Sequence, residues 1–309
     1  VYVIAEAAGS HCQDYNKAEA LVRAAAEAGA DAIKFQLITP ELLCADVPLP
    51  LGINATHDAW LQRLGVTRLR DLFAKGGLPR AWCTPLKALA ESLGLAWLCT
   101  PFSVAEAMFL VEDVEVQGLK IASGDLMFTP LLQYAARTGL PLIISTGGAT
   151  EVEVYEALAL INQHSGRNSY AFCDQVVLMH CRSIYPCPDI LANLRAIDTL
   201  YRDMQVAAVG WSDHTLSADI VPALAVACGA TCLEKHVKLE HDTSSIDANH
   251  SLTPLAFKSM VETVRNVPLI LGSAEKTPHP LEMHDRVFAR RDPSDWLRPT
   301  ARGREGYWQ

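Results

Sequence analysis

Short apolar runs alternate along the chain with longer segments in which apolar residues recur at helical spacing. The short runs are almost continuously apolar, as in "VYVIAEA" at 1–7 and "PLIISTG" at 141–147. Eight such runs predict strands, at residues 1–7, 32–37, 96–102, 118–124, 141–147, 175–181, 207–214 and 231–237. The longer segments predict helices, at residues 16–29, 103–114, 129–139, 150–163, 193–204, 217–229 and 253–267. This alternation is typical of repeated β–α units.

Strands that are apolar on both faces belong to a parallel sheet that helices cover. Eight β–α units within 309 residues favour an α/β fold, the (β/α)8 TIM barrel, over an open doubly wound sheet, which would be expected to carry a GxGxxG turn. We predict a barrel domain over 1–272 and an extended C-terminal tail over 273–309. The long connection over 38–95 is predicted to be a loop at the active-site face.

Charge and composition exclude several classes of partner. The net charge is −9 and no Lys/Arg run exceeds two residues, so we expect no nucleic-acid partner. No run of 18 apolar residues is present, and the first residues lack the basic region of a signal peptide, so we expect no membrane association. The nine cysteines form no CxxC pair, which indicates reduced thiols and a cytoplasmic protein.

Polar residues occupy the ends of the predicted strands, where the pattern would otherwise be apolar. Three of them are lysines, Lys34, Lys120 and Lys235, and burying three unpaired ammonium groups would be prohibitive. Strand ends converge on one site in a barrel, so a bound phosphate and carboxylate would offset this cost, with hydrogen bonds from Ser123, Ser145 and Ser212. Mutual salt bridges with Glu6 and Asp125 are the alternative.

Two histidines end the neighbouring strands seven and eight. His214 and His236 could bind a divalent metal through neutral imidazoles and leave positions open for substrate, or they could be core residues. His11 and His250 stand in predicted loops that could approach the same site.

An ordered set of motifs resembles the sialic acid synthase family. They are "IAEAAGSH", "DAIKFQL", "CTPFS", "KIASGDL", "PLIISTGGAT", "HCRSIYPCP", "GWSDHTL" and "LEKHVKL", spread over residues 1–275. The resemblance implies a TIM-barrel transferase that condenses phosphoenolpyruvate with a sugar aldehyde. The products of the family are 2-keto-3-deoxy sugar acids, and phosphate is released by C–O cleavage.

The resemblance also implies roles for individual residues. The positions matching phosphoenolpyruvate-binding residues are Lys34, Lys120, Ser123, Ser145, Ser183 and Ser212. His214 and His236 match the ligands of Mn²⁺, or of another divalent cation such as Mg²⁺ or Co²⁺, and Glu6 and Asp125 match acid–base carboxylates. The sugar-binding positions are Gln36, Tyr185, Lys235 and Asp247. A homodimer is the family expectation.

The chain departs from the family pattern in three places. "AGSHCQD" stands where the family has GxNHNG, and "SIDANH" at 245–250 stands where it has GPDH. The family also carries a C-terminal antifreeze-like domain with a sugar-binding arginine, and we expect the tail to stand in its place. The acceptor is therefore left open between an N-acetylmannosamine-like and a modified sugar. Two alternatives also stay open: another metal-dependent TIM-barrel aldolase or phosphodiesterase, and a non-catalytic ligand-binding paralogue.

Overall fold

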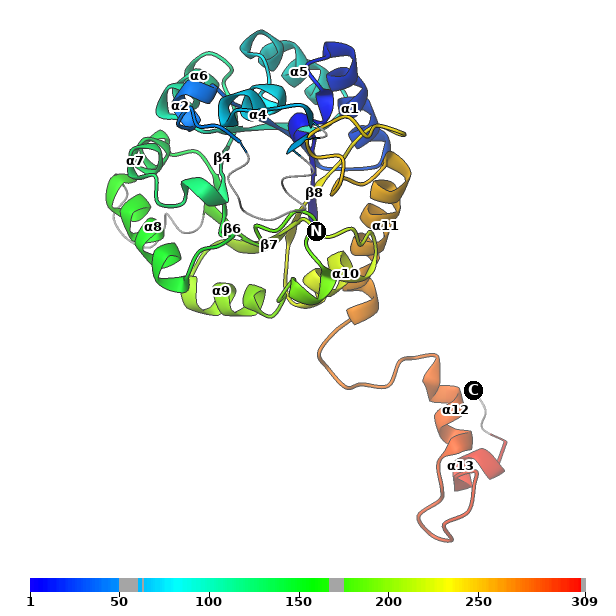
Figure 1. The fold of residues 1–309 in the computed structure, drawn as a ribbon. Coiled ribbons are helices and arrows are strands. Elements are labelled where there is room, and N and C mark those ends of the chain that lie inside the picture. The colour runs from blue at the N-terminus through cyan, green and yellow to red at the C-terminus, as the bar shows by residue number, and fades with distance from the viewer. Residues whose placement is uncertain (50–60, 63, 167–174, 307–309) are drawn as a thin grey trace. The chain divides into compact units, whose positions relative to one another are not determined.

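Eight parallel strands form a barrel with helices around it in the computed structural model of the chain, confirming the predicted (β/α)8 fold (Figure 1). The structure describes residues 1–49, 61–62, 64–166 and 175–306. The sheet runs in the order β3-β2-β1-β8-β7-β6-β5-β4, and β3 and β4 lie next to each other at the remaining seam. The strands are β1 Tyr2–Glu6, β2 Ala32–Leu37, β3 Ala96–Pro101, β4 Leu119–Ile121, β5 Leu142–Ser145, β6 Val176–Cys181, β7 Ala208–Asp213 and β8 Cys232–His236.

Helices follow the strands, and several of the described ones begin at a residue whose side chain accepts a free backbone amide. The helices of the barrel are α1 Tyr15–Glu27, α2 Pro40–Leu43, α4 Leu69–Gly76, α5 Arg80–Ser92, α6 Val104–Glu112, α7 Thr129–Thr138, α8 Glu151–His164, α9 Ala196–Met204, α10 Ile220–Ala227 and α11 Pro254–Leu271. Asp14 accepts from the Asn16 amide at the start of α1, and Thr150 and Glu153 form a capping box on α8. Gly139, with φ 69°, ends α7.

The predicted elements differ from the observed ones mainly in two regions. The run at 118–124 forms only the short β4, because a 3-10 helix, η2 Ser123–Asp125, follows it directly. The connection at 38–95 was predicted to be a loop, but it contains α2, α4 and α5. Pro85 inside α5 and the many Pro and Gly residues around it obscured the helical pattern. Residues 50–60 and 63 of this connection lie outside the described residues.

The two faces of the barrel sheet bury different layers. The outer face packs against the helices in a large apolar core that includes Ile33, Phe35 and Trp211. The inner face carries a small apolar layer of Ile4, Ala32, Leu98, Met179 and Cys232. Alternate residues of a strand share a face, so the next inward positions lie closer to the carboxyl ends of the strands. Those positions hold the polar residues of the candidate site.

A second compact unit spans Leu271–Gln309, of which residues 307–309 are not described. It contains α12 Glu282–Ala289 and α13 Ala301–Arg304, which the sequence analysis did not predict. Asp292 accepts hydrogen bonds from the Ser294 amide and from the Ala301 amide, and the Arg304 guanidinium pairs with Asp295. The predicted domain boundary between 272 and 273 stays a prediction.

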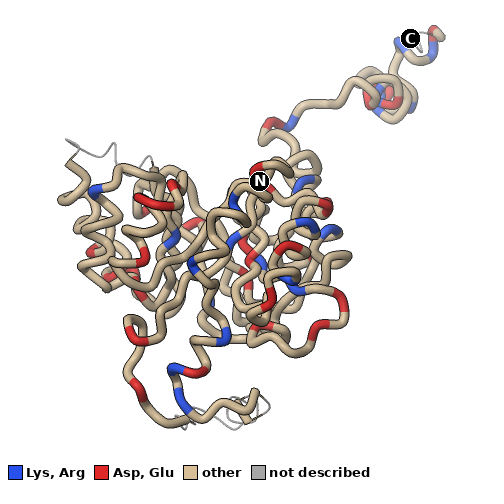
Figure 2. The backbone as a smooth tube through the Cα atoms, turned by 90° about the horizontal axis from the view of Figure 1, so that it is seen from above, with Lys and Arg blue, Asp and Glu red and all other residues tan. Residues whose placement is uncertain are grey.

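The charges, the longest helices and the thiols of the described residues can each be located in the structure. Lys and Arg are interspersed with Asp and Glu along the barrel rather than gathered on one face (Figure 2). No helix in the described part of the chain is long and apolar enough to cross a membrane. Eight cysteines are described and all are free, whereas Cys173 lies outside the described residues.

Candidate active site

A buried group of four charged side chains lies inside the barrel, toward the carboxyl ends of the strands. Lys34 Nζ lies 2.8 Å from Glu6 Oε2 and 3.6 Å from Glu234 Oε2. Lys120 Nζ lies 2.8 Å from Glu234 Oε2 and 3.0 Å from Glu234 Oε1. All four side chains are at most 6% exposed. Two carboxylates and two ammonium groups are therefore paired with one another in a nearly buried position.

The surroundings of these four groups set their protonation. Burial raises the pKa of Glu6 to about 7, although the adjacent Lys34 opposes the shift. Burial alone would also raise the pKa of Glu234, but Lys120 and Lys34 hold it well below its usual value. Burial lowers the pKa of Lys120, whereas Glu234 and Glu6 keep the pKa of Lys34 above its usual value against the effect of burial. Glu6 is thus the member of the group that can exchange a proton near neutral pH.

Glu234 is a site residue that the sequence analysis missed. Lys235 and His236 in "TCLEKHV" were both predicted to be site residues. Adjacent residues of a strand, however, face opposite sides of the sheet. Cys232 lies in the inner apolar layer, so Glu234 and His236 follow it on the inner face. The two-residue period of the strand could have identified Glu234.

Lys235 is not brought together with the other predicted site residues. Its Nζ pairs with Asp213 Oδ2 at 2.9 Å and donates to the carbonyl oxygens of Thr215 at 2.6 Å and Ser217 at 3.1 Å. The side chain is fully buried. Its neighbour Leu233 belongs to the outer core, so Lys235 faces the helices rather than the barrel interior. These contacts tie β8 to β7 and to the segment after it.

The predicted serines line the barrel beside the lysines. Ser212 Oγ donates to Glu234 Oε1 at 3.0 Å, and Ser123 Oγ accepts from the Gly147 amide at 2.9 Å. Ser145 Oγ is buried without a hydrogen-bond partner among the described residues. A Cβ atom on Gly147 would lie 2.5 Å from Ser183 Oγ and 2.9 Å from Ser123 Oγ. Gly147 therefore allows the hydroxyl groups of Ser123 and Ser183 to approach the backbone at the ends of β4 to β6 more closely than any side chain would permit.

Asp125 ends the short helix η2, directly after β4. Its Oδ2 atom is buried and finds no hydrogen-bond partner in the described part of the chain. Burial raises the pKa of Asp125 to about 6, and the charge of Glu106 adds to the shift. Of the alternative salt bridges, the one between Lys34 and Glu6 forms, whereas Asp125 pairs with no lysine among the described residues and Glu234 pairs with both Lys34 and Lys120. Asp125 is left as a carboxyl group that can exchange protons near neutral pH.

Three histidines and a tyrosine meet above the charged group. The ring centroid of His236 lies 5.5 Å from that of His214 and 4.5 Å from that of His250. The ring of Tyr185 lies 4.1 Å from the His214 ring. Burial lowers the pKa of His214 to about 4 and that of His236 well below its usual value, so both rings are neutral at pH 7. Neutral imidazole is the form that binds metals.

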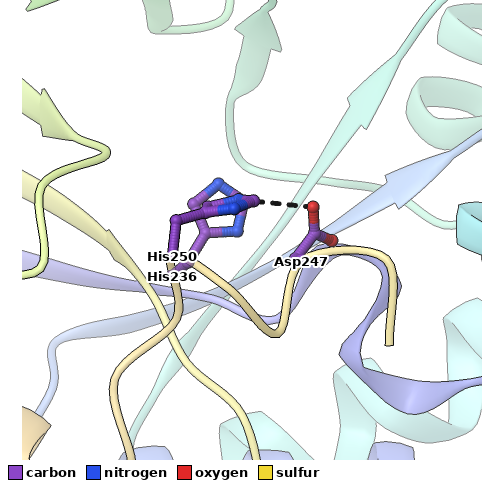
Figure 3. A group of neighbouring side chains, drawn as sticks. All are labelled: His236, Asp247 and His250. Carbon is purple, nitrogen blue, oxygen red and sulfur yellow. Dashed lines mark ion pairs between the residues drawn. The ribbon is translucent and has the colours of Figure 1, made fainter. Parts of the chain in front are cut away.

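Asp247 and His250 come from the loop after β8 and reach the same point as His236 (Figure 3). One ligand atom from each of these three residues lies within 4.8 Å of the other two. His250 Nε2 is 3.4 Å from Asp247 Oδ1, and Asp247 Oδ2 accepts from the Gly9 amide at 2.9 Å. Burial alone would raise the pKa of Asp247, but His250 and His236 hold it below its usual value. The structure thus brings a predicted sugar-binding residue, Asp247, into contact range of a predicted metal ligand.

Two further predicted residues have clear positions. Gln36 Nε2 donates to Glu6 Oε1 at 2.7 Å, so Gln36 lies at the edge of the charged group. His11, which was expected in a loop near the site, is fully buried between the rings of Trp82 and Phe35. It belongs to the packing between η1 Ala8–His11 and the helices rather than to the histidine group.

Comparisons with known proteins agree with this geometry. The model of the NeuB family matches residues 21–276, which include nearly all of the barrel. The chain belongs to the NeuB family. The N,N'-diacetyllegionaminic acid synthase of Legionella pneumophila is 35% identical to it, over 94% of this chain and 78% of that protein. The pseudaminic acid synthase of Helicobacter pylori is 32% identical, over 94% of this chain and 81% of that protein.

Solved structures place the NeuB-family barrel among sugar acid synthases. The crystal structure of an N-acetylneuraminic acid synthetase from Leptospira borgpetersenii with citrate matches with a TM-score of 0.77 at 30% identity. The match covers 92% of this chain and 90% of that chain. A truncated 3-deoxy-D-arabino-heptulosonate 7-phosphate synthase from Thermotoga maritima shares the fold, with a TM-score of 0.62 at 14% identity. The predicted family resemblance and the enzyme class, a transferase of the sialic acid synthase type, are confirmed.

The donor atoms of this NeuB-family site suit a divalent cation. His214 Nδ1 lies 2.7 Å from the Arg182 carbonyl oxygen, a contact that orients the ring and leaves Nε2 for a ligand. His236 Nδ1 is buried without a hydrogen-bond partner among the described residues. Imidazoles together with one carboxylate suit first-row divalent metals such as Mn²⁺ and Co²⁺. The residues present therefore fit the predicted metal.

Proposed function

We propose that this chain condenses phosphoenolpyruvate with the open-chain aldehyde of an acetamido sugar, giving a 2-keto-3-deoxy sugar acid and phosphate. The observation that carries the proposal is the joint placement of Lys34, Lys120 and the hydroxyl groups of the predicted serines in the same barrel as the histidine group. One half of this arrangement suits a phosphorylated carboxylate and the other suits a polarised carbonyl group.

Phosphoenolpyruvate would bind through the lysines and the predicted serines. Glu6 and Glu234 already neutralise the two lysines. Protonation of Glu6 would leave the group with a net positive charge, and this charge would favour binding of an anion. The pKa of about 7 for Glu6 makes this proton available near neutral pH. Ser145 Oγ, buried and without a partner among the described residues, is free to donate to the phosphate or carboxylate oxygens.

The reaction requires both substrates to be bound next to each other at the carboxyl ends of the barrel strands. Carbon 3 of phosphoenolpyruvate attacks the aldehyde carbon, the aldehyde oxygen takes up a proton and becomes a hydroxyl group, positive charge develops at carbon 2, and water adds there with loss of one proton. The resulting tetrahedral intermediate breaks its C–O bond and releases phosphate. A divalent cation held by His214 and His236 would supply Lewis acidity toward the aldehyde oxygen. Asp125 would take the proton of the attacking water, and Lys34 and Lys120 would hold the anion in position before and after bond cleavage.

The acceptor is an acetamido sugar of the class named in the relatives. Legionaminic and pseudaminic acid synthases are among the similar proteins, and so is a sialic acid synthetase structure. Gln36 and Tyr185 would contact the sugar. An N-acetylmannosamine-like or a modified aldehyde meets these requirements. Mn²⁺ as the metal, a homodimer and a cytoplasmic location complete the proposal.

Phosphate release from phosphoenolpyruvate with Mn²⁺, measured across a panel of acetamido sugars, tests the proposal. We expect release that depends on both a sugar and the metal. His214→Ala and His236→Ala should retain the fold by circular dichroism and lose at least about 100-fold in turnover. Full activity of either variant in metal-free buffer would remove the proposed mechanism. Inactivation by borohydride in the presence of substrate would instead indicate a Schiff-base aldolase.

A further inference from the structure

The loop between β8 and α11 carries two potential metal ligands that the histidine pair predicted from the sequence does not include. Asp247 and His250 lie three residues apart and converge on His236 (Figure 3). At metal–ligand lengths of about 2.1 Å, two ligand atoms of one ion lie roughly 3 to 4 Å apart. His250 Nε2 and Asp247 Oδ1, at 3.4 Å, already have this spacing.

Two ring nitrogens in this group lack the hydrogen bonds that buried polar atoms normally make. His236 Nδ1 and His250 Nε2 are both buried and have no hydrogen-bond partner among the described residues. The two residues are only 6% and 5% exposed. Because buried polar atoms nearly always have a partner, two unpartnered ring nitrogens grouped with one carboxylate form a donor set that suits a shared ligand. A single cation between the rings and Asp247 would satisfy the two nitrogens together.

The loop is held firmly enough to serve as part of a preformed site. Leu252 forms a bridge with Val237, and its amide donates to the His236 carbonyl oxygen at 2.9 Å. Lys238 Nζ donates to the Ala248 carbonyl oxygen at 2.8 Å, and Ser251 Oγ donates to the Asp247 carbonyl oxygen at 2.7 Å. These contacts tie the ligand-bearing turn to the last residue of β8 and to the residues directly after it, and one of them closes the turn on itself. The ligands are therefore positioned by the folded chain before any ion binds.

We propose that His250 and Asp247 bind the divalent cation directly, together with His236. The inference rests on the proposed function for the presence of a metal, and it adds two protein ligands to the pair predicted from sequence. With His214 alongside, the ion would have three imidazoles and one carboxylate around it. An octahedral ion would then keep about two positions for substrate and water. Such a site binds its metal in the absence of phosphoenolpyruvate and sugar.

Metal titration of the chelator-treated full chain tests the proposal. The probe is Mn²⁺, with free ion measured by electron paramagnetic resonance and no substrate present. We expect His250→Gln to weaken Mn²⁺ binding at least about tenfold, because one ligand is lost. His236→Gln is the positive control, and His284→Gln, on the exposed side of α12, is the matched control that should not change affinity. A loss smaller than tenfold for a folded His250→Gln chain overturns the proposal.

A crystal structure of the unaltered chain with Mn²⁺ decides the matter if the variant fails to fold. An anomalous peak within about 2.5 Å of a His250 nitrogen is expected, and a peak held by His214 and His236 with His250 beyond that distance overturns the inference. Neither measurement uses turnover. Metal binding as expected without phosphate release would defeat the proposed function alone, whereas phosphate release with unchanged metal binding in His250→Gln would defeat this inference alone.

Discussion

Glu6 and Glu234 are the same chemical group in the same buried layer, yet their partners give them opposite properties. Glu234 pairs with two lysines and stays ionised, whereas Glu6 pairs with one lysine, Lys34, and burial raises its pKa to about 7. Sequence could not distinguish them, because the difference comes from which side chains the barrel brings together. A residue's charge at the site is therefore a property of the fold.

Asp125 should control the acid side of the pH profile. A base must be ionised to accept a proton, so the carboxylate is lost as pH falls through the pKa of about 6. We expect kcat to fall about tenfold per pH unit below that value. His214, with a pKa of about 4, becomes charged only at lower pH. Asp125→Asn should lower kcat, and its kcat should no longer depend on pH between roughly pH 5 and 8. Asp113→Asn, a substitution on the surface, should keep the decrease of kcat at acid pH.

Lys120 should matter for phosphoenolpyruvate more than for sugar. Lys120→Met keeps the length of the side chain but removes a charge-assisted contact worth about 1.5–3 kcal/mol, or roughly 10- to 100-fold in affinity. Calorimetric titration with phosphoenolpyruvate should show this loss, and the KM of the sugar should change much less. An unchanged affinity for phosphoenolpyruvate would contradict the role of Lys120.

At the scale of elements, β8 shows how strand periodicity divides chemistry between two faces. Cys232, Glu234 and His236 face the barrel interior, while Leu233 and Lys235 face the helices. The sequence predicts that "TCLEKHV" ends at the site, and the structure places Glu234 beside Lys120 and His236 beside His250. The sequence did not indicate that the neighbouring residues Glu234 and Lys235 have different roles, because both interrupt the same apolar run.

Lys235→Met should therefore affect stability rather than substrate binding. The substitution leaves Asp213 buried without its ion-pair partner, which costs about 3–5 kcal/mol. Urea unfolding should show this loss, while the KM values of the folded variant for both substrates stay within about threefold of the unaltered chain. Normal stability with a raised KM for the sugar would support the sugar-binding role predicted from the sequence instead.

At the scale of the whole molecule, the barrel could be predicted because its strands and helices follow periodic patterns. The regions that could not be predicted lack such a pattern. The helices within 38–95 are interrupted by Pro and Gly, and α12 and α13 lie in a charged, Pro-rich segment. His250 was noted only as a loop residue, because its approach to His236 depends on how the loop after β8 turns back. Local patterns contain little information about such long-range contacts.

The central claim, that this barrel joins phosphoenolpyruvate to an aldehyde by breaking the C–O bond, is tested most directly with an oxygen label. Phosphoenolpyruvate carrying ¹⁸O in the bridge between carbon 2 and phosphorus would be turned over with Mn²⁺ and an acceptor sugar, and the products analysed by mass spectrometry. The account predicts that the label leaves with phosphate. Recovery of the label in the keto acid, which requires P–O cleavage, would contradict it.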